Sequence, residues 1–375
     1  MNNISILIPF GERLNSYYGG AVARWVNEVY SRVDGDCKIK VYGRVCNDKN
    51  DYKSINVISK YNAIFNFITR VPYIRRSLFW LYCRLYYKNI KESSIIEVHN
   101  SYQYIHILRK MGFKGKIILH MHNDYLGFIS REYLENINSN IDLLVTCSDF
   151  LRQRIKNKSE ELYKKSITVY NGFDENLFFP KNKDATEELS IGYVGRIDFN
   201  KGLHLLLDVY ERLLIRIPDL KLLIIGSSDF GKSASSYEKM CKEKVNKLQK
   251  EKNANIDYIG YVHNEKLVNY YNKFTLFCSF SLQNEAFGMT YIEAMACKIP
   301  VLANNIGGVK EAVNFDKMLV NNIDNLRQVE EKAYELLINK ELSATMSNLA
   351  YDFVQKNFKW STIADKKLKI LNRLL

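Results

Sequence analysis

The sequence predicts an α/β protein with two doubly wound domains that face a central cleft. Three observations support this prediction: a length of 375 residues, an alternation of strand-like and helix-like segments, and a restart of that alternation after a polar stretch. A chain of this length is too long for one ordinary hydrophobic core and suits two domains. Strands that alternate with helices form parallel sheets covered on both faces, and sites in such sheets gather at the carboxyl ends of the strands.

The first series of elements runs through residues 1–170, which we expect to form the N-terminal domain. Short apolar runs alternate there with helix-like segments at 20–32, 102–112 and 149–158. Apolar runs of this length between helical segments are typical of buried strands. We expect the strands at 4–10, 37–43, 94–99, 115–122 and 141–148.

The second series follows the polar stretch KNKDATEELS at 181–190. Its strands are expected at 191–197, 220–226, 255–261, 274–280 and 299–305. We expect a C-terminal domain over 171–358. The last residues, 359–375, are expected to form a helix that crosses back to the N-terminal domain.

Composition excludes several classes of protein. The 7 cysteines are odd in number and have no C-x-x-C spacing, which favours reduced thiols over a disulfide framework or a zinc site. The N-terminus, MNNISILIPF, begins with a strand pattern and shows no signal peptide. No run of about 18 apolar residues predicts a membrane-spanning helix. We therefore expect a cytoplasmic protein.

The positive charge is concentrated in the first half of the chain. Residues 1–180 contain 26 Lys and Arg against 17 Asp and Glu, within a net charge of +13. This excess suits an anionic partner such as nucleic acid, a lipid surface or a phosphorylated glycan. The segment 69–91 has six basic residues, no acidic ones and interleaved aromatic residues, and Pro72 is expected to mark its helix start.

Such a segment is typical of an interfacial helix on a membrane or of a surface for an anionic acceptor. The alternative is a helix that packs its aromatic side on the sheet and leaves its arginines in solvent. Nucleic acid is not expected as a partner, because no nucleic-acid-binding motif accompanies the charge.

Three glycine-containing loops follow predicted strands and precede predicted helices. GYVGRIDFNKG at 192–202 places Arg196 and Lys201 beside a helix start, which suits a diphosphate, although a plain basic loop is the alternative. NIGGVKEAV at 305–313 contains Gly307-Gly308, and YYGGAVARW at 17–25 contains Gly19-Gly20. Glycine pairs leave room for close approach of a ligand to the backbone. Their common position at the ends of strands supports the prediction of a ligand-binding site there.

The stretch NEAFGMTYIEAMAC at 284–297 contains two acids with E-x7-E spacing, Glu285 and Glu293. A helix beginning at Met289 would place Glu293 on a largely apolar face, where a carboxylate needs hydrogen-bond partners such as vicinal hydroxyls. Glu285 would lie on the preceding loop and point into the cleft. The backbone N–H groups around 287–289 would offer a second phosphate contact at the helix N-terminus.

Together these segments resemble the retaining glycosyltransferases of family GT4. The resemblance covers roughly residues 165–315 and extends to Gly19-Gly20 and to IILHMHND at 117–124. The matching segments occur in the family's order: VYNGFDENLFFP, GYVGRIDFNKGLHLL, LKLLIIG, IDYIGYV, NEAFGMTYIEAMAC and IPVLANNIGGVKEAV. The resemblance implies a GT-B fold of two Rossmann-like domains, the first binding the acceptor and the second the nucleotide sugar.

The family's site residues map onto this sequence by position. Glu293 matches the residue that holds the ribose hydroxyls, and Glu285 the one that contacts the donor sugar at the reacting end. Arg196 and Lys201 match the pair that neutralises the leaving diphosphate. His122 matches a histidine near the donor sugar and the attacking hydroxyl.

Other donor contacts are implied through the backbone. The amides that bind sugar hydroxyls and phosphate correspond to Phe287, Gly288 and Met289. The first-domain loop that closes on the diphosphate corresponds to Gly20, beside Gly19. The edge that recognises the base corresponds to Tyr261 and Val262.

The resemblance implies transfer of a hexose or N-acetylhexosamine from a UDP-sugar to a saccharide acceptor, with retention by front-face attack and without a divalent metal or other cofactor. VHNSYQY, ILHMHND and the segment 226–245 resemble lipopolysaccharide-core α-1,2-N-acetylglucosaminyltransferases more narrowly, which makes GlcNAc the expected sugar. Alternatives are an O-antigen, capsule or other glycolipid transferase, a non-catalytic sugar-nucleotide-binding protein, and an epimerase or phosphorylase. The location that fits is peripheral, on the inner face of the cytoplasmic membrane.

Two sequence patterns suggest a metal, and we expect neither to bind one. Asp34-Gly35-Asp36 is more typical of a turn. The histidines His99, His120 and His122 suggest zinc, but we find no cysteine or acid nearby to complete a ligand set. We therefore expect a core role for His120 and a polar role in the cleft for His122.

The chain also departs from the family's pattern. Tyr170-Asn171-Gly172 stands where Pro-Asn-Gly is common, and Ala286 replaces the proline of Glu-Pro-Phe-Gly. Lys298 replaces a glycine after the expected helix, which weakens the predicted C-cap. These departures leave every charged site residue in place and put only the sugar selectivity in doubt.

Overall fold

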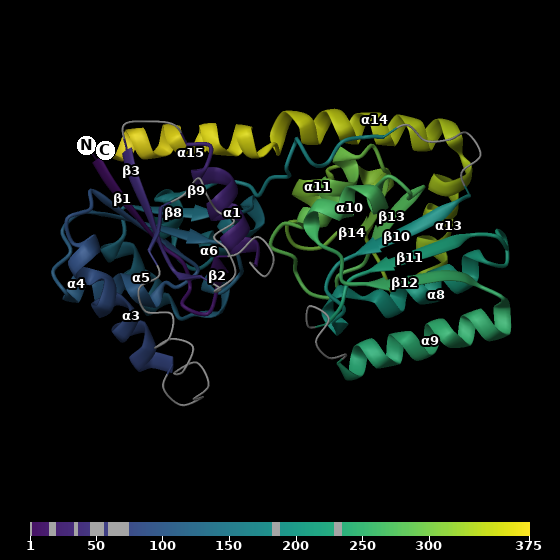
Figure 1. The fold of residues 1–375 in the computed structure, drawn as a ribbon, viewed down its shortest axis with the longest axis horizontal. Coiled ribbons are helices and arrows are strands. Elements are labelled where there is room, and N and C mark those ends of the chain that lie inside the picture. The colour runs from purple at the N-terminus through teal and green to yellow at the C-terminus, as the bar shows by residue number, and fades with distance from the viewer. Residues whose placement is uncertain are drawn as a thin grey trace. The chain divides into compact units, whose positions relative to one another are not determined.

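The computed structural model describes residues 2–14, 20–33, 37–45, 56–58, 75–181, 188–228 and 235–375. The chain divides into two compact units, Met1–Asn171 with Trp360–Leu375, and Gly172–Lys359. Each unit contains a parallel sheet covered by helices, so the predicted α/β class with two doubly wound units is confirmed (Figure 1). Gly19, Asp34-Gly35-Asp36 and the beginning of the basic segment, 69–74, lie outside the described residues.

The first unit is built on a parallel sheet in the order β5-β3-β1-β6-β7-β8-β9. Its central strand β6 reads IIEVH and is buried at every position, as expected for a strand covered on both faces. A two-stranded sheet pairs β2 (Arg13–Leu14) with β4 (Arg44–Val45). The strands of the main sheet are β1 (Asn2–Leu7), β3 (Cys37–Tyr42), β5 (Asn56–Ile58), β6 (Ile95–His99), β7 (Lys116–Met121), β8 (Leu143–Thr146) and β9 (Ser166–Thr168).

Helices cover both faces of this sheet. The helices α3, α4 and α5 share one apolar core with the sheet, while α1 packs against the C-terminal helix α15 (Figure 1). Serine side chains begin three of the helices, because Ser130, Ser148 and Ser159 accept hydrogen bonds from N–H groups of the first turn. The helices are α1 (Ala21–Tyr30), α3 (Arg75–Ile90), α4 (Gln103–Lys110), η2 (Leu126–Phe128), α5 (Arg131–Asn140), α6 (Asp149–Lys156), α7 (Glu160–Lys164) and α15 (Trp360–Leu374).

The second unit contains a parallel sheet in the order β12-β11-β10-β13-β14-β15. The chain leaves β10 toward β11 on one side and later continues from β13 on the other, so the strand order reverses at β10. Ligands bind at this kind of reversal in open α/β sheets. The strands are β10 (Ser190–Val194), β11 (Lys221–Ile225), β12 (Asn255–Gly260), β13 (Leu276–Ser279), β14 (Val301–Asn304) and β15 (Leu319–Val320).

The helices of the second unit follow its strands. An apolar core joins the sheet to α8, α9 and α13, and α11 packs against α14. The helices are η3 (Phe199–Lys201), α8 (Leu203–Leu213), α9 (Ser236–Lys252), α10 (Asn264–Tyr271), α11 (Met289–Ala296), α12 (Val309–Val313), η4 (Asp316–Met318), α13 (Leu326–Ile338) and α14 (Lys340–Asn357). No helix in the described part of the chain is long and apolar enough to cross a bilayer.

Each of the ten strands expected from the sequence is present, with ends that differ by a few residues. The sequence did not predict β2, β4, β5, β9 and β15, which have two or three residues each; β5, β9 and β15 lie at the edges of the two main sheets. Strands of two or three residues contain no apolar run long enough to be recognised in the sequence. The predicted helices at 20–32, 102–112 and 149–158 correspond to α1, α4 and α6.

Candidate active site

The first candidate residue, Lys201, lies at the end of the turn η3 between β10 and α8. The Asp198 side chain begins this turn by accepting a hydrogen bond of 3.0 Å from the backbone N–H of Asn200. Gly202 then adopts a left-handed φ of 63°, and a side chain at this position would overlap the carbonyl oxygen of Phe280. The turn therefore requires glycine, and it presents Lys201 at the carboxyl end of the sheet.

Lys201 contacts the first acid of the E-x7-E pair. Its ammonium forms an ion pair with the Oε1 atom of Glu285. The hydroxyl of Ser281 donates to the same oxygen at 2.9 Å. The structure thus joins two loops that the sequence separates by 84 positions.

The Gly307-Gly308 turn supports the backbone of Glu285. The N–H of Gly308 donates to the carbonyl oxygen of Glu285 at 2.8 Å. Gly307 has a left-handed φ of 59°, and a side chain there would overlap the same carbonyl oxygen. A Cβ on Gly308 would overlap the carbonyl oxygen of Ala286. The glycine pair is therefore required for close packing between the loops that follow β13 and β14.

The helix α11 begins where the sequence predicted, at Met289. Gly288 precedes it with a left-handed φ of 101°, a conformation that residues with a Cβ rarely adopt. Phe287 is buried, and its ring meets that of Phe358 edge to face at 5.2 Å. The left-handed Gly288 and the buried Phe287 therefore constrain the backbone conformation of 287–289 at the start of α11.

The second acid, Glu293, lies on the inner face of α11 and is only 2% exposed. Its Oε2 atom accepts a hydrogen bond of 2.9 Å from the hydroxyl of Tyr271. The prediction that Glu293 lies on an apolar face rather than in solvent is confirmed. Lys298, after the helix, adopts φ of 56°, so a lysine takes the left-handed position for which the family's glycine is suited.

A cavity of about 190 Å³ lies at the carboxyl ends of β10, β11 and β12. It brings together Arg196, Tyr261 and Val262, three of the residues predicted for the donor site. The Arg196 guanidinium forms an ion pair with Asp198. The remaining lining residues are mostly small or aliphatic: Val194, Gly195, Ile225, Gly226, Ser227, Ser228 and Leu267.

Glu238 orders one wall of this cavity, and the sequence analysis missed it. Its carboxylate accepts hydrogen bonds from the backbone N–H of Ser228 at 2.8 Å and from the hydroxyl of Tyr258 at 3.1 Å. Burial would raise its pKa, but hydrogen bonds from Ser228 and Lys242 lower it to about 2. The sequence signal was Ser235-x-x-Glu238, a capping-box pattern. Ser235 does cap α9, but the glutamate binds the cavity wall instead.

In the first unit, Gly20 lies at the N-cap of α1. The carboxylate of Glu12 lies at this helix end and accepts a hydrogen bond of 3.4 Å from the N–H of Ala23. A side chain at position 20 would overlap Glu12. An acidic side chain thus occupies part of the helix terminus at which the sequence analysis expected a diphosphate.

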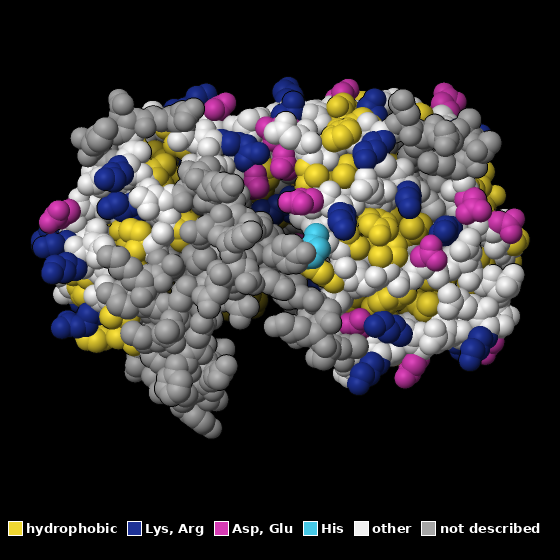
Figure 2. All heavy atoms as spheres, viewed as in Figure 1, with side chains coloured by type: hydrophobic (Ala, Val, Ile, Leu, Met, Phe, Trp, Pro, Cys, Tyr) yellow, Lys and Arg dark blue, Asp and Glu magenta, His cyan; other side chains and the backbone are white. Residues whose placement is uncertain are grey.

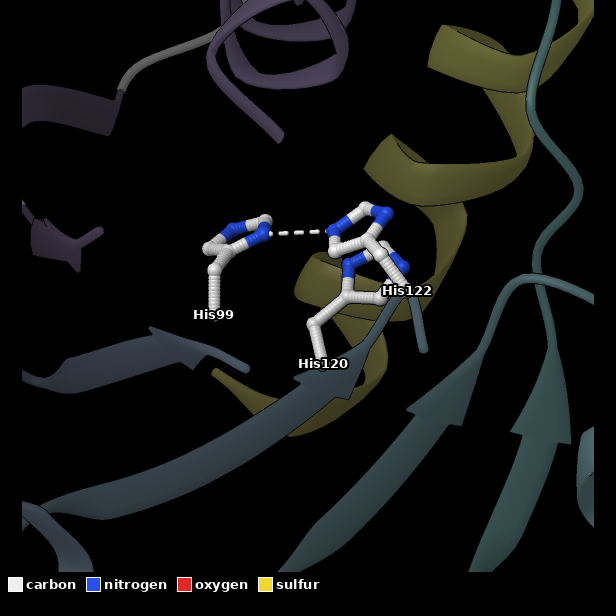
Figure 3. A group of neighbouring side chains, drawn as sticks. All are labelled: His99, His120 and His122. Atoms are coloured by element: carbon white, nitrogen blue, oxygen red, sulfur yellow. Dashed lines mark hydrogen bonds between the residues drawn. The ribbon is translucent and has the colours of Figure 1, made fainter. Parts of the chain in front are cut away.

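His122 lies just beyond β7 in a group of three buried histidines (Figure 3). His99 ends β6, and His120 is its register partner on β7. The Nδ1 atom of His99 and the Nε2 atom of His122 are 2.9 Å apart and share a hydrogen bond. The backbone N–H of His122 donates to the Oδ1 atom of Asn100 at 2.7 Å.

The expectation that no acid lies near these histidines is wrong. Glu97 is fully buried beside them, with its Oε1 atom 3.1 Å from the Nδ1 atom of His120 and 3.3 Å from the Nε2 atom of His99. It lies two residues before His99 on β6, and alternate residues of a strand share a face. The other oxygen, Oε2, is 2.7 Å from the ammonium of Lys367 on α15 and accepts a hydrogen bond from the hydroxyl of Tyr30.

The pKa shifts show which of these groups carry charge. Burial would raise the pKa of Glu97, but the Lys367 ammonium, helped by the two histidines, holds it well below its usual range. Burial lowers the pKa of His120 to about 3 and lowers those of His99 and His122 as well. At neutral pH the group therefore contains an ionised Glu97 and neutral imidazoles. The ligand atoms of the three histidines lie within 4.8 Å of one another, so these residues are the metal candidates in the described chain.

Comparison with known proteins identifies the second unit. The family model "Glycosyl transferases group 1" matches residues 174–353, nearly the whole of that unit. The chain is similar to spore coat protein SA of Bacillus subtilis, with 24% identity over 74% of this chain and 78% of that protein. It is 25% identical to the lipopolysaccharide 1,2-N-acetylglucosaminetransferase of Salmonella typhimurium, over 91% of this chain and 94% of that protein.

The solved structures show the fold of the whole chain. The structure of HepE from Anabaena in complex with UDP-glucose aligns with 99% of this chain and 99% of the HepE chain. The TM-score is 0.73 and the sequence identity is 17%. The strand orders of both units and this likeness agree with the GT-B fold expected from the sequence. Residues 174–353 therefore match the model of the group 1 glycosyltransferase family, and the chain as a whole has the GT-B fold.

Proposed function

We propose that this protein is a retaining glycosyltransferase of family GT4 that moves N-acetylglucosamine from UDP-GlcNAc to a saccharide acceptor of lipopolysaccharide core. The observation that carries the proposal is the assembly around E-x7-E. Glu285 is bonded to Lys201 and supported by Gly308, and Glu293 is buried on the helix that follows. The Salmonella relative supports the choice of sugar and acceptor, since it is named as a lipopolysaccharide 1,2-N-acetylglucosaminetransferase.

In this proposal the donor lies along the carboxyl ends of β10–β14. The base enters the cavity at Tyr261 and Val262, and the ribose hydroxyls bond to Glu293, whose carboxylate Tyr271 holds in place. The sugar hydroxyls meet Glu285 and the backbone amides of Phe287, Gly288 and Met289. In the first unit, we assign Gly20, with Gly19 before it in the sequence, to the diphosphate, and His122 to the sugar and the attacking hydroxyl.

Charge development explains the choice of residues. When the bond between the anomeric carbon and the phosphate oxygen breaks, negative charge grows on the departing UDP and positive charge on the sugar. Lys201 and Arg196 are placed to stabilise the first, and their ion pairs with Glu285 and Asp198 keep them at the loop ends until a phosphate competes for them. Fixed charges of this kind stabilise a transition state without reorganisation.

Retention follows from attack on the face that UDP leaves. The acceptor oxygen forms the new bond to the anomeric carbon, and its proton passes to the leaving phosphate. Glu285 is therefore assigned a binding role and not that of the nucleophile used by retaining hydrolases. Because Arg196 and Lys201 supply the positive charge at the diphosphate, the proposed reaction needs no divalent metal.

We further propose that the protein works at the inner face of the cytoplasmic membrane. The helix α3 buries Leu78, Tyr82 and Tyr86 against the first unit, so the packing explanation for its aromatic residues has support. Its other side exposes Trp80 at 48%, with the Arg84 guanidinium 5.1 Å above the indole ring. On the face shown in Figure 2, the basic side chains of the second unit are interspersed with acidic ones, which does not favour that face for an anionic surface.

Vesicle binding tests this location. The double variant Trp80→Ser/Arg84→Ser should bind vesicles of anionic lipid more weakly than the original chain. Phe128→Ser/Arg131→Ser is the matched control, because it also removes an exposed aromatic residue and an exposed arginine from the first unit. Equal loss in both variants would contradict a specific role of α3 at the membrane.

A donor screen with purified protein tests the reaction. UDP release is followed from UDP-GlcNAc, UDP-Glc and UDP-Gal, each with and without truncated lipopolysaccharide-core acceptors. We expect acceptor-dependent release from UDP-GlcNAc, and a raised KM for that donor in Glu293→Ala. Preference for UDP-Glc would favour the runner-up, a glucosyltransferase of another surface glycan, which the UDP-glucose complex of HepE supports. Release from none of the donors would contradict the proposal.

A further inference from the structure

The buried histidines form a row of close polar contacts that ends at His122. Glu97, His99 and His122 succeed one another along it: Glu97 Oε1 is 3.3 Å from His99 Nε2, and His99 Nδ1 is 2.9 Å from His122 Nε2. His120 contacts the same Glu97 oxygen but is not between His99 and His122. We call Glu97, His99 and His122 the histidine relay.

Ring geometry shows that the link between His99 and His122 is an in-plane hydrogen bond. Their planes differ by only 14°, with ring centroids 5.2 Å apart and facing nitrogens 2.9 Å apart. Two rings with these values lie edge to edge in nearly one plane. The lone pair of an imidazole nitrogen lies in the ring plane, so each nitrogen points at the other (Figure 3).

The same geometry opposes a shared metal ion. His120 is stacked on His122, with centroids 4.2 Å apart and planes that differ by 19°. Stacked rings direct their lone pairs along parallel planes, whereas a metal requires lone pairs that converge on one point. The ammonium of Lys367, 2.7 Å from Glu97, adds a positive charge next to the same group.

The carboxylate of Glu97 sets the direction of the hydrogen bonds. The groups around it are all donors: Lys367, Tyr30 and His120. A bare Nε2 on His99 would direct its lone pair at this carboxylate, so Nε2 carries the hydrogen. A neutral imidazole has one donor and one acceptor nitrogen, and therefore Nδ1 of His99 accepts from the Nε2–H of His122.

We infer that Glu97 and His99 are positioning residues that hold His122 in the Nε2–H tautomer, with Nδ1 presented as an acceptor for a sugar hydroxyl. Asn171, which ends the first of the two segments of this unit, lies beside His122 and interacts with it. Its amide N–H suits a bare Nδ1 when no substrate is present. The sugar hydroxyl as a substrate group rests on the proposed function, whereas the tautomer of His122 does not depend on that function.

The arrangement resembles the logic of a catalytic triad, in which an acid fixes the tautomer of a histidine without taking its proton. Here the acid acts through a second imidazole. The backbone on either side adds to the positioning, because Asn100 accepts from the N–H of His122 and Cys147 donates to its carbonyl oxygen. His122 therefore has both its ring orientation and its acceptor nitrogen determined before a substrate arrives.

Nitrogen-15 NMR of histidine-labelled full-length protein tests the tautomer directly. In the original chain we expect His122 with a protonated Nε2 and a bare Nδ1, its signals being those lost in His122→Gln. Glu97→Gln should mix the tautomers of His99 and His122. It should also lower kcat by about 10²-fold or more, as replacement of a triad acid by its amide does, with less change in the KM for the donor.

The matched control is His120→Asn. It keeps a donor to Glu97 from an equally buried position outside the relay, so we expect the tautomer of His122 to be unchanged. Because Glu97→Gln leaves Lys367 buried without its partner, the double variant Glu97→Gln/Lys367→Met is measured alongside it and should show the same mixing of tautomers.

Three results would overturn the inference: a proton on Nδ1 of His122 in the original chain, unchanged tautomers in both Glu97 variants, or stoichiometric binding of Zn²⁺ that shifts the signals of all three histidines. The spectra need no substrate. If the spectra are as expected but no glycosyl transfer is found with any donor, then the proposed function is overturned and the tautomer assignment stays in place.

Discussion

Two lysine–glutamate pairs, one from each unit of the protein, differ in their surroundings. In the first unit, Lys367 of α15 and Glu97 of β6 are both 0% exposed. In the second unit, the side chains of Lys201 and Glu285 are 29% and 19% exposed, at the loop ends of the sheet. The same two residue types thus form an enclosed pair in one unit and an accessible pair in the other.

The difference indicates what each pair can do. A buried pair loses its hydration, so it needs further donors and acceptors on every side, and breaking it leaves an uncompensated charge. The accessible pair is worth little for stability, because water and salt screen it. It can, however, exchange its partner for a phosphate at little cost. We therefore expect the enclosed pair to determine stability and the accessible pair to determine turnover.

The largest expected effect is that of Lys367→Met on stability. The substitution leaves the Glu97 carboxylate buried without its counter-charge, which should lower the free energy of unfolding by about 3–5 kcal/mol. Urea unfolding followed by circular dichroism measures this change. Lys369→Met, at an exposed position of the same helix, is the control. Similar unfolding curves for the two variants would show that the enclosed pair does not stabilise the first unit.

Lys201→Ala should act on catalysis instead. Loss of a charge aimed at the departing diphosphate should reduce kcat by about 10²–10³-fold, or roughly 3–4 kcal/mol of barrier. Its unfolding free energy should change by less than about 1 kcal/mol, as is usual for exposed pairs. Steady-state kinetics with the preferred donor provide the measurement, with the exposed Lys239→Ala as control. A variant that unfolds as easily as Lys367→Met but transfers sugar normally would reverse the comparison.

A smaller effect is expected at the glycine turn of the second unit. In Gly308→Ala the new methyl group would overlap the carbonyl oxygen of Ala286, so the two loops must separate. Overpacking of this kind costs about 1–3 kcal/mol. Thermal unfolding can measure it against Gly195→Ala, whose new Cβ would meet only the Tyr193 side chain, at 3.4 Å or more. Equal melting temperatures for the two variants would argue that the loops are loosely packed.

The smallest expected effect is on how the stability of the first unit depends on pH. The folded-state pKa of His120 is about 3, below the value of 6.5 for an unperturbed histidine. Between these values the unfolded chain binds a proton that the folded chain does not, so stability falls as the pH decreases below 6.5. Each such histidine contributes up to about 1.4 kcal/mol per pH unit.

His120→Asn removes one of these groups and should reduce the pH dependence by that amount. Urea midpoints measured near pH 7.5 and near pH 5.5 provide the comparison, and a salt-matched buffer pair serves both proteins. If the original chain and the variant lose stability equally between the two conditions, then His120 is not held neutral in the folded state.

The motifs of the second unit could be predicted from sequence because local backbone geometry requires their residue types. Gly202, Gly288 and Gly307 all adopt a positive φ at junctions between strand and helix, where a side chain is strained or overlaps a neighbour. Such positions are visible in the sequence as glycines in the short loop that follows an apolar run. The role of Glu238 was hidden, because its capping pattern predicts a local bond while its actual partners are Ser228 and Tyr258.

The chemistry of the first unit was predicted only in part. The H-x-H pattern is visible, and the pattern Glu97-x-His99 on the preceding strand could have placed an acid on the same face. Lys367 could not have been paired with Glu97 from the sequence: the return of the C-terminal helix to the first unit was expected, but which of its lysines meets a buried acid is decided by tertiary packing. The same holds for the short edge strands β5 and β9, which neighbouring strands define.

The place of α15 in the first unit also bears on the order in which the protein can fold during synthesis. Domains usually fold as they emerge from the ribosome, the N-terminal one first. Here the residues of the second unit, 172–359, are contiguous and complete when Lys359 has emerged. The first unit must wait for Trp360–Leu375, and until then Glu97 has no lysine beside it. The unit that is translated first is therefore the one that is finished last.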